Sequence, residues 1–147
     1  MADIVQRLRA ALIAVLDTGV TIAALTGRAS ENLVAWNALA EAPKPVIAYR
    51  VIDLRQNGES GDGRDGLVQF TAVAEGNDAD SVVQELLGAV ETDLTAEALL
   101  AAGVDAAPLL FERRDGDTLD QGDEDDVRMH QRNLHAAHLD VAITLTV

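Results

Sequence analysis

The chain has 147 residues, about the size of one domain, and 48% of them are apolar, which suffices for one sizeable core and excludes wholesale disorder. It has no cysteine, which excludes disulfides, thiolate zinc sites and cysteine nucleophiles. The formal net charge is −14, the excess lies beyond residue 53, and seven acids without a base fall in 115–126, so binding to the DNA backbone is disfavoured.

The first segment predicts a helix over residues 3–17, because its apolar side chains recur at 3.6-residue spacing on one face. Asp3, with Gln6 three residues later, resembles a capping box. A shorter helical turn follows at TIAALTG (21–27), which Gly27 closes. The apolar face of the first helix consists of Ile4, Leu8, Leu12 and Val15, with Val5 and Leu16 beside it.

Strand patterns occupy the next part of the chain. LVAW (33–36) predicts a short strand, and PVIAYRVIDL (45–54) predicts a longer one with Pro45 at its start, because proline cannot donate to a ladder. LVQFTAVA (67–74) predicts its hairpin partner, and we expect a mobile tip at 56–66, which is rich in Gly and Asp. The longer strand is apolar on both faces, with Ile47, Tyr49 and Val51 on one and Val46, Ala48 and Ile52 on the other.

Two further helices and two strands follow. We expect Asp78 to cap a helix over 79–94, and Thr95 to cap a shorter one that ends at Ala102, just before Gly103. PLLFERR (108–114) predicts a strand, and after a second mobile insertion at 115–126, LDVAITLTV (139–147) alternates as a half-buried strand does. The apolar stripe of the longer helix comprises Val82, Val83, Leu86, Leu87, Val90 and Leu94, and the apolar side of the last strand comprises Leu139, Val141, Ile143, Leu145 and Val147.

Strands that are adjacent in the sequence, with helices grouped apart from them, indicate the α+β class. We expect a single domain over 1–147, with a mostly antiparallel mixed sheet and helices packed on one face. No apolar run approaches the roughly 20 residues that cross a bilayer, and the patch ALIAVL is followed by Asp17 instead of a cleavage site. We therefore expect a soluble protein without a targeting segment.

Two motifs suggest ligands that their context does not favour. GDGRDG (61–66) satisfies the dinucleotide fingerprint, but such a site must open a helix, and a strand pattern follows here. The acidic stretch 115–126 suggests calcium, yet counting from Asp115 puts Leu119 and Asp120 where an EF-hand needs a ligand and a glycine. We expect a hairpin tip and a solvated acidic loop, with weak, nonspecific Ca²⁺ or Mg²⁺ binding as the alternative for the loop.

All three histidines lie in HQRNLHAAHLD (130–140). In an extended segment His130 and His138 share a face about 27 Å apart, while His135 points to the other face. Only a helix would pair His135 with His138, and a catalytic zinc site also needs a third ligand and an ordered base. We expect no metal and no cofactor, and we interpret these histidines as polar positions at a sheet edge or a subunit contact.

Nucleophilic catalysis has little support in the sequence. The serines Ser30, Ser60 and Ser81 lie outside any nucleophile-elbow pattern, and no spacing of histidines and acids supports a triad. We expect that the protein is not an enzyme.

Taken in order, several segments resemble the tail-terminator, or tail-completion, proteins of long-tailed phages and of gene transfer agents. The amphipathic N-terminal helix runs into ALTGR, which contains Arg28, and PKPVIAYRVID follows with Pro45, Ile47 and Tyr49 at matching positions. A helix after the hairpin, a variable acidic insertion and the closing strand HLDVAITLTV complete the likeness. It spans nearly the whole chain and rests on the order and length of the segments.

This resemblance implies a mixed sheet with helices, assembled as a ring, typically a hexamer, that caps the finished tail tube and joins it to the head connector. Such a protein ends tube polymerisation by matching the last tube ring on one face only. The implied partners are further copies of the chain, the tail tube protein and the head-tail connector protein. The implied location is the neck of the virion after assembly in the host cytoplasm, away from membranes.

The resemblance also suggests a use for the charge. Six copies at −14 each give −84, and acids that face a channel would repel DNA in transit without binding it. The candidate channel-facing residues are Asp117, Asp120, Asp123 and Asp125, and the candidate subunit interface is Arg128, His130 and Arg132. Two alternatives stay open: another neck or head-closure connector protein, and a small metal-dependent enzyme that uses His135, His138 and acids of 115–126.

Overall fold

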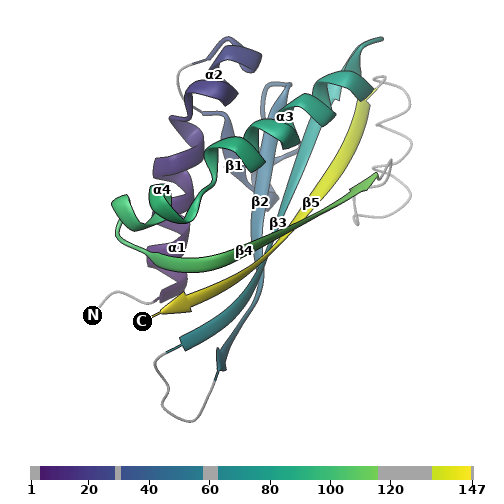
Figure 1. The fold of residues 1–147 in the computed structure, drawn as a ribbon. Helices are drawn as coiled ribbons and strands as arrows, with labels where there is room; N and C mark the ends of the chain where they lie inside the picture. Colours follow the sequence, from purple (N-terminus) through teal and green to yellow (C-terminus); the bar gives the residue numbers. More distant parts are fainter. Residues whose placement is uncertain (1–3, 29–30, 58–62, 116–133, 147) are drawn as a thin grey trace.

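The computed structural model describes residues 4–28, 31–57, 63–115 and 134–146 (Figure 1). Its helical elements are α1 (Ile4–Leu12), the π-helical turn η1 (Ile13–Asp17), α2 (Val20–Thr26), the 3₁₀ turn η2 (Trp36–Ala38), α3 (Ala79–Asp93) and α4 (Ala96–Ala101). Its strands are β1 (Leu33–Ala35), β2 (Val46–Asn57), β3 (Gly63–Glu75), β4 (Asp105–Asp115) and β5 (Leu134–Thr146).

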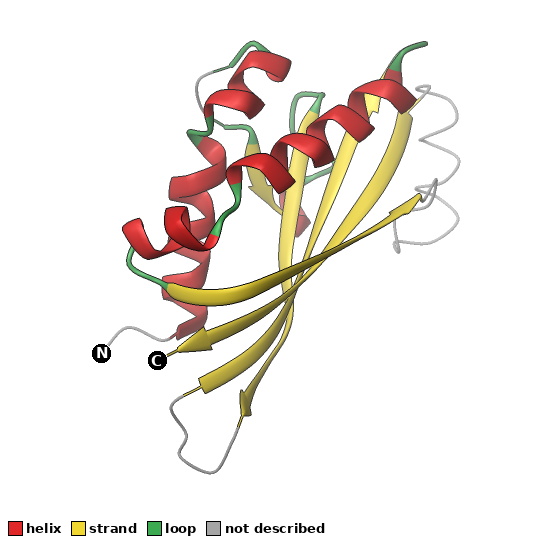
Figure 2. Ribbon diagram, in the orientation of Figure 1, coloured by secondary structure: helices red, strands yellow, loops and turns green. Residues whose placement is uncertain are grey.

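The strands form one sheet in the order β1-β2-β3-β5-β4. β1 runs parallel to β2, and every other neighbouring pair is antiparallel. The four α-helices lie on one side of this sheet (Figure 2). The predicted α+β class, with a mostly antiparallel mixed sheet and helices on one face, is therefore confirmed. We call the other side of the sheet the open face.

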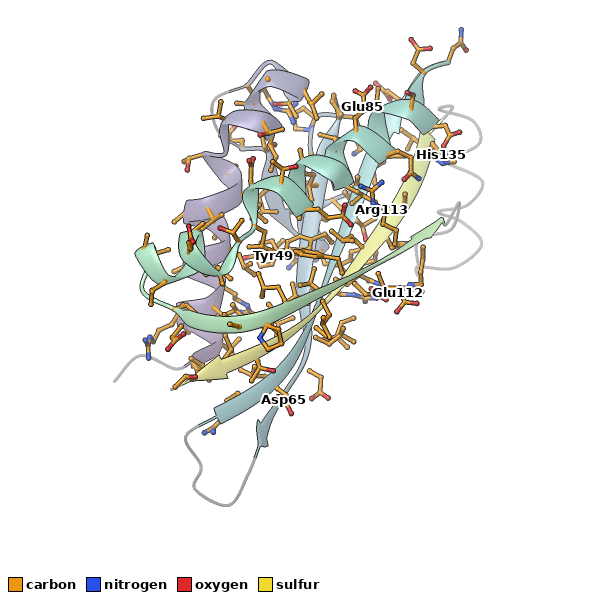
Figure 3. The ribbon with its side chains drawn as sticks, in the orientation of Figure 1. Tyr49, Asp65, Glu85, Glu112, Arg113 and His135 are labelled. Carbon is orange, nitrogen blue, oxygen red and sulfur yellow. The ribbon has the colours of Figure 1, made fainter. Side chains whose placement is uncertain are left out.

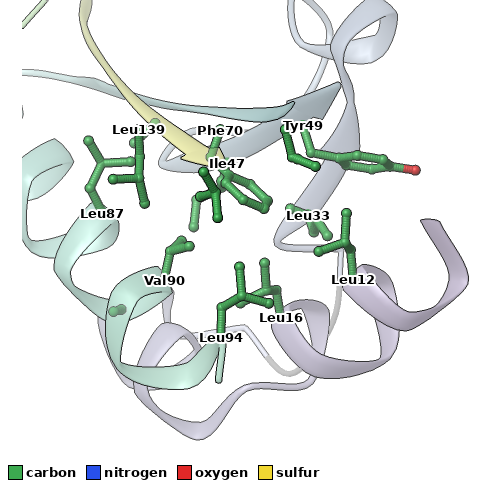
Figure 4. Close-up of a cluster of buried hydrophobic side chains, with 14 of the residues drawn as sticks. Leu12, Leu16, Leu33, Ile47, Tyr49, Phe70, Leu87, Val90, Leu94 and Leu139 are labelled. Atoms are coloured by element: carbon green, nitrogen blue, oxygen red, sulfur yellow. The ribbon is translucent and has the colours of Figure 1, made fainter. Parts of the chain in front are cut away.

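The main core fills the space between the helices and the sheet (Figure 4). Phe70 of β3 and Leu87 of α3 are fully buried in it, and each such side chain stabilises the fold by roughly 1.5–3 kcal/mol. The predicted stripe of α3 and the predicted apolar side of β5 both contribute to this core, which confirms their periodicity. The buried members are Val83, Leu86, Leu87, Val90 and Leu94 from the stripe, and Leu139, Val141, Ile143 and Leu145 from β5.

A smaller apolar cluster lies on the open face. Val46 and Ala48 of β2 pack there with Leu39, which follows η2. Because Ile47 and Tyr49 point into the main core, the first four residues of β2 are buried from both sides, as their sequence predicts.

The N-terminal helices are attached to the sheet by a polar network. The predicted helix over 3–17 forms as α1 followed by η1, so its last turn is π-helical, and Asp3 lies outside the described residues. Arg28 donates from Nε to Asn32 Oδ1 (3.2 Å) and from its guanidinium to the carbonyl of Pro45. Asn32 is fully buried and returns a bond from Nδ2 to the carbonyl of Arg28 (3.2 Å). Arg28 therefore ties the turn after α2 to the start of β2.

The helix ends follow the expected chemistry with one exception. Gly27 closes α2 in the left-handed conformation (φ 73°), which glycine adopts without strain. Thr95 caps α4, because its Oγ1 accepts the Ala98 N–H at 3.0 Å. Asp78 precedes α3, but its side chain makes no capping hydrogen bond, so the side-chain cap predicted for Asp78 is wrong.

The hairpin strands are longer than predicted. β2 and β3 pair as far as Asn57 opposite Gly63, so most of the predicted tip at 56–66 is strand, and only 58–62 lies outside the described residues. Gly66 belongs to β3, where the close packing favours glycine: a Cβ there would lie 2.9 Å from Leu54 Cδ1. The second predicted insertion begins inside β4, which ends at Asp115, and 116–126 lies outside the described residues.

No single helix among the described residues is long and apolar enough to cross a membrane. The pair Ile4–Asp17 and Val20–Thr26 passes that test only when taken together, with a bend of 59° between its parts. Its apolar side chains Leu8, Leu12, Leu16 and Ile22 are buried in the core.

Candidate functional site

A row of polar side chains crosses the open face over four strands. Arg50 of β2 donates from Nε to Gln69 Oε1 of β3 (3.0 Å), and Gln69 donates from Nε2 to Asp140 Oδ1 of β5 (3.3 Å). Arg114 of β4 completes the row through an ion pair from Nε to Asp140 Oδ2 (2.9 Å). We call Arg50, Gln69, Asp140 and Arg114 the polar row. It crosslinks the sheet because each side chain bonds to one on the neighbouring strand.

The two described histidines lie on opposite faces of β5. His138 is buried on the open face, where its Nδ1 lies 2.8 Å from Thr71 Oγ1. His135 is on the helix side, and its Nε2 lies 3.3 Å from Asp80 Oδ1 of α3 (Figure 3). Since β5 is a strand here, the helical pairing of His135 with His138 does not form.

The interpretation of these histidines as sheet-edge positions is wrong for His135 and His138, and the alternative of a subunit contact stays a prediction. β5 lies between β3 and β4, so neither residue is on an outer strand. His138 is instead a hydrogen-bonded core residue of the open face, since only 8% of its surface is exposed. His130 lies outside the described residues.

A cavity of about 300 Å³ opens where β1 ends beside β2. The guanidinium carbon of Arg50 lies 4.5 Å from the centroid of the Trp36 ring, a cation–π contact. Tyr49 approaches the cavity from the helix side, with its hydroxyl directed away from the core (Figure 4). We call this the edge cavity; its lining is Arg9, Ala35, Trp36, Asn37, Tyr49 and Arg50.

A second hollow of about 250 Å³ lies toward the opposite edge of the sheet, near β4. Leu110 lines it and is 64% exposed, and Leu67 and Ala142 lie beside it in the register of β3, β5 and β4. Glu112 and Asp140 provide its acidic lining. The sheet therefore has a basic and aromatic cavity at its β1 edge and an apolar and acidic hollow near β4.

The residues predicted from the sequence as functional are not placed by the structure. Asp117, Asp120, Asp123 and Asp125 lie outside the described residues, and so do Arg128, His130 and Arg132. In GDGRDG (61–66), the residues from Gly63 onward belong to β3 and pair with β2, so this motif does not open a helix. Within the described ranges, no three His, Asp or Glu side chains converge as metal ligands would.

The polar row and the edge cavity were not predicted. Arg50 and Gln69 are more than fifteen residues apart in the sequence, and Asp140 is more than seventy residues beyond Gln69. The alternating polar positions within β2, β3 and β5 are visible in the sequence, but only the strand order and register bring them side by side.

No protein-family model matches this chain, and a search of curated proteins found no significant match.

Proposed function

We propose that this chain is a structural protein of a phage-like particle, which assembles into a ring that caps the tail tube, ends tail polymerisation and joins the tail to the head connector. Its partners in this proposal are further copies of itself, the tail tube protein and the head-tail connector protein. The family resemblance implies six copies in the ring. It resides in the virion neck, and DNA passes through the ring without specific binding.

The observation that carries this proposal is that the sheet has two different outer edges. In the described part of the chain, β4 pairs only with β5, and β2 from Arg50 onward pairs only with β3, since β1 covers only Ile47 to Tyr49. An outer strand presents unpaired N–H and C=O groups to other chains. Two unlike edges on one subunit suit a head-to-tail contact, which generates a ring when the rotation between subunits closes.

The charge of the chain supports the same proposal. A hexamer carries −84, since each copy contributes −14, and a channel lined by acids repels the phosphates of passing DNA. We place Asp117, Asp120, Asp123 and Asp125 toward this channel and Arg128, His130 and Arg132 at the subunit interface, as part of the proposal.

A related neck or head-closure connector is the nearer alternative, because it differs only in which ring it contacts. The metal-dependent enzyme is the farther one, and it loses its predicted ligand pair because His135 and His138 lie on opposite faces of β5.

Electron microscopy of the purified protein tests the ring. We expect six-fold particles, formed either by the protein alone or after addition of tail tube subunits. A strict monomer by light scattering under both conditions would overturn the proposal.

A tube-growth assay separates the terminator from the connector. Adding the protein to polymerising tube subunits should stop elongation and leave a ring at one tube end. A protein that binds the head connector and leaves tube growth unchanged would be a connector instead.

A further inference from the structure

We propose that neighbouring copies join by antiparallel pairing of the outer edge of β4 with the outer edge of β2 on the next copy, and that Glu112 of the first copy enters the edge cavity of the second. This inference rests on the proposed ring, and it specifies which surfaces form the subunit contact.

The strand directions favour this contact. β2 and β5 point the same way, because each is antiparallel to β3, and β4 is antiparallel to β5. β4 therefore runs opposite to β2. When a second copy is placed beside the first with its open face on the same side, β4 of one copy meets β2 of the other as an antiparallel pair. This is the arrangement in which strands form perpendicular hydrogen bonds.

The proposed pairing follows when the register of the sheet continues into the next copy without a shift. One row across the open face consists of Arg50, Gln69, Asp140 and Glu112, which are successive partners. Continuing this row into the next copy places Glu112 opposite Arg50. Side chains that are directly opposite in an antiparallel pair lie close enough to interact.

The pairing of Glu112 with Arg50 also sets the position of Leu110. In an antiparallel pair, a step of two residues backward on β4 corresponds to a step of two residues forward on β2, so Leu110 lies opposite Ile52. Within one copy, the row that contains Leu67, Ala142 and Leu110 ends at Asp53 on β2, and Ile52 is the bulge residue directly before Asp53.

The side chains at both pairings are complementary. Ile52 is 46% exposed and Leu110 is 64% exposed, so the contact would cover two large apolar side chains that water now surrounds. Glu112 is exposed and makes no ion pair with another described residue, and Figure 3 shows it on the opposite side of β4 from Arg113. Arg9 and Arg50 line the edge cavity, so the cavity is basic and complements the charge of Glu112.

The length of the contact has clear limits. Beyond Arg50, toward the start of β2, the edge is occupied by β1. On β4 the pairing with β5 is interrupted between Ala106 and Leu109, and Pro108 has no N–H to donate. The contact therefore joins 109–112 of one copy to 50–53 of the next.

A disulfide test exploits the absence of cysteine in the chain. In the variant with both Ile52→Cys and Leu110→Cys, oxidation should produce a ladder of covalent oligomers on a non-reducing gel. Within one copy the two positions are three strand spacings apart, about 14 Å, which is too far for a disulfide. Each single variant should give no ladder.

Two results would overturn the contact. A covalent dimer from Leu110→Cys alone, at the same yield as the double variant, would mean that β4 pairs with β4. No crosslink from the double variant, although rings are visible by microscopy, would refute this contact and leave the proposed function standing. A ladder without closed rings would support the contact and count against the ring.

A charge exchange tests the role of Glu112. Glu112→Arg should raise the protein concentration at half-assembly about tenfold, because like charges then meet at the contact. Arg9→Glu should have a similar effect, and the double variant should recover most of the loss. Glu85→Arg on the helix side of the molecule is the matched control and should assemble as the original chain does. Equal assembly by Glu112→Arg and the control would refute the role of Glu112.

Discussion

Asp17, at the end of the first helical segment, holds the backbone of Asn32 at the entry to β1: the Asn32 N–H donates to Asp17 Oδ1 at 2.6 Å. The same oxygen accepts the Leu33 N–H at 3.0 Å. β1 has only three residues, so few ladder bonds hold it beside β2, and this carboxylate adds two bonds at its start. Asp17 thereby couples the first helical segment to the sheet edge, in addition to the Arg28 contacts.

Asp17→Ala should lower the free energy of unfolding by about 2 kcal/mol, because two backbone donors lose a charged acceptor. Urea denaturation followed by circular dichroism measures this loss. Asp17→Asn keeps one acceptor oxygen in a similar position, so it should lose no more than half as much free energy of unfolding as Asp17→Ala. Equal stability of Asp17→Ala and the original chain would show that water replaces the carboxylate without cost.

The two helix starts after β3 should respond differently to removal of their capping side chains. Thr95→Ala should cost about 1 kcal/mol, since its Oγ1 accepts the Ala98 N–H. Asp78→Ala should cost less than about 0.5 kcal/mol at moderate salt, because Asp78 makes no capping bond and screening weakens its interaction with the helix dipole. Thermal unfolding of both variants in one buffer tests this order, and a larger loss for Asp78→Ala would contradict it.

Gly19 and Gly88 should respond in opposite ways to substitution by alanine. A Cβ on Gly19 would lie 2.5 Å from Asp93 Oδ2, a buried atom, and 3.2 Å from the Val15 carbonyl, so Gly19→Ala should cost about 1–3 kcal/mol. A Cβ on Gly88 meets only the end of the flexible Arg113 side chain at 3.2 Å, and alanine is the better helix former. Gly88→Ala should therefore be neutral or stabilising in chemical denaturation, and a larger loss than for Gly19→Ala would refute the packing argument.

Reversing Asp117, Asp120, Asp123 and Asp125 to lysine changes the net charge of each copy from −14 to −6, since each substitution adds two charges. Under the proposed channel role, assembly should be intact while DNA ejection is impaired, because lysines bind the phosphates that aspartates repel. Infectivity and ejection assays on particles with the variant measure this. The four Asp→Asn substitutions should have a weaker effect, and unchanged infectivity of the lysine variant would overturn the channel placement.

Much of the fold was predictable because its signals are local. The alternation of Leu139, Val141 and Ile143 predicts a strand with one buried side, and the structure confirms it. Thr95 and Gly27 also mark helix ends by chemistry that acts within a few residues. The extension of the hairpin was missed, because glycines such as Gly63 and Gly66 are typical of loops. The structure pairs both with β2 and shows that a Cβ on Gly66 would crowd Leu54.

The polar features of the open face were not predictable in the same way. Nothing near His138 in the sequence indicates Thr71 as its partner, because that contact depends on β3 and β5 being neighbours in a particular register. The edge cavity likewise needs Arg9 from α1 and Arg50 from β2 to meet beside Trp36. Both features depend on how distant segments pair in the sheet. Residue patterns within one segment do not reveal that pairing.

The position of β5 in the sheet sets the order in which the chain can fold as it is synthesised. β4 leaves the ribosome before β5, yet its only strand partner among the described residues is β5, and β3 also has to wait for β5 on one side. Until Leu134–Thr146 has emerged, one edge of β3 and both edges of β4 lack a strand partner among the described residues. Such long-range pairing is slow and prone to aggregation, so we expect this protein to depend on chaperones during synthesis more than a helical protein of equal length.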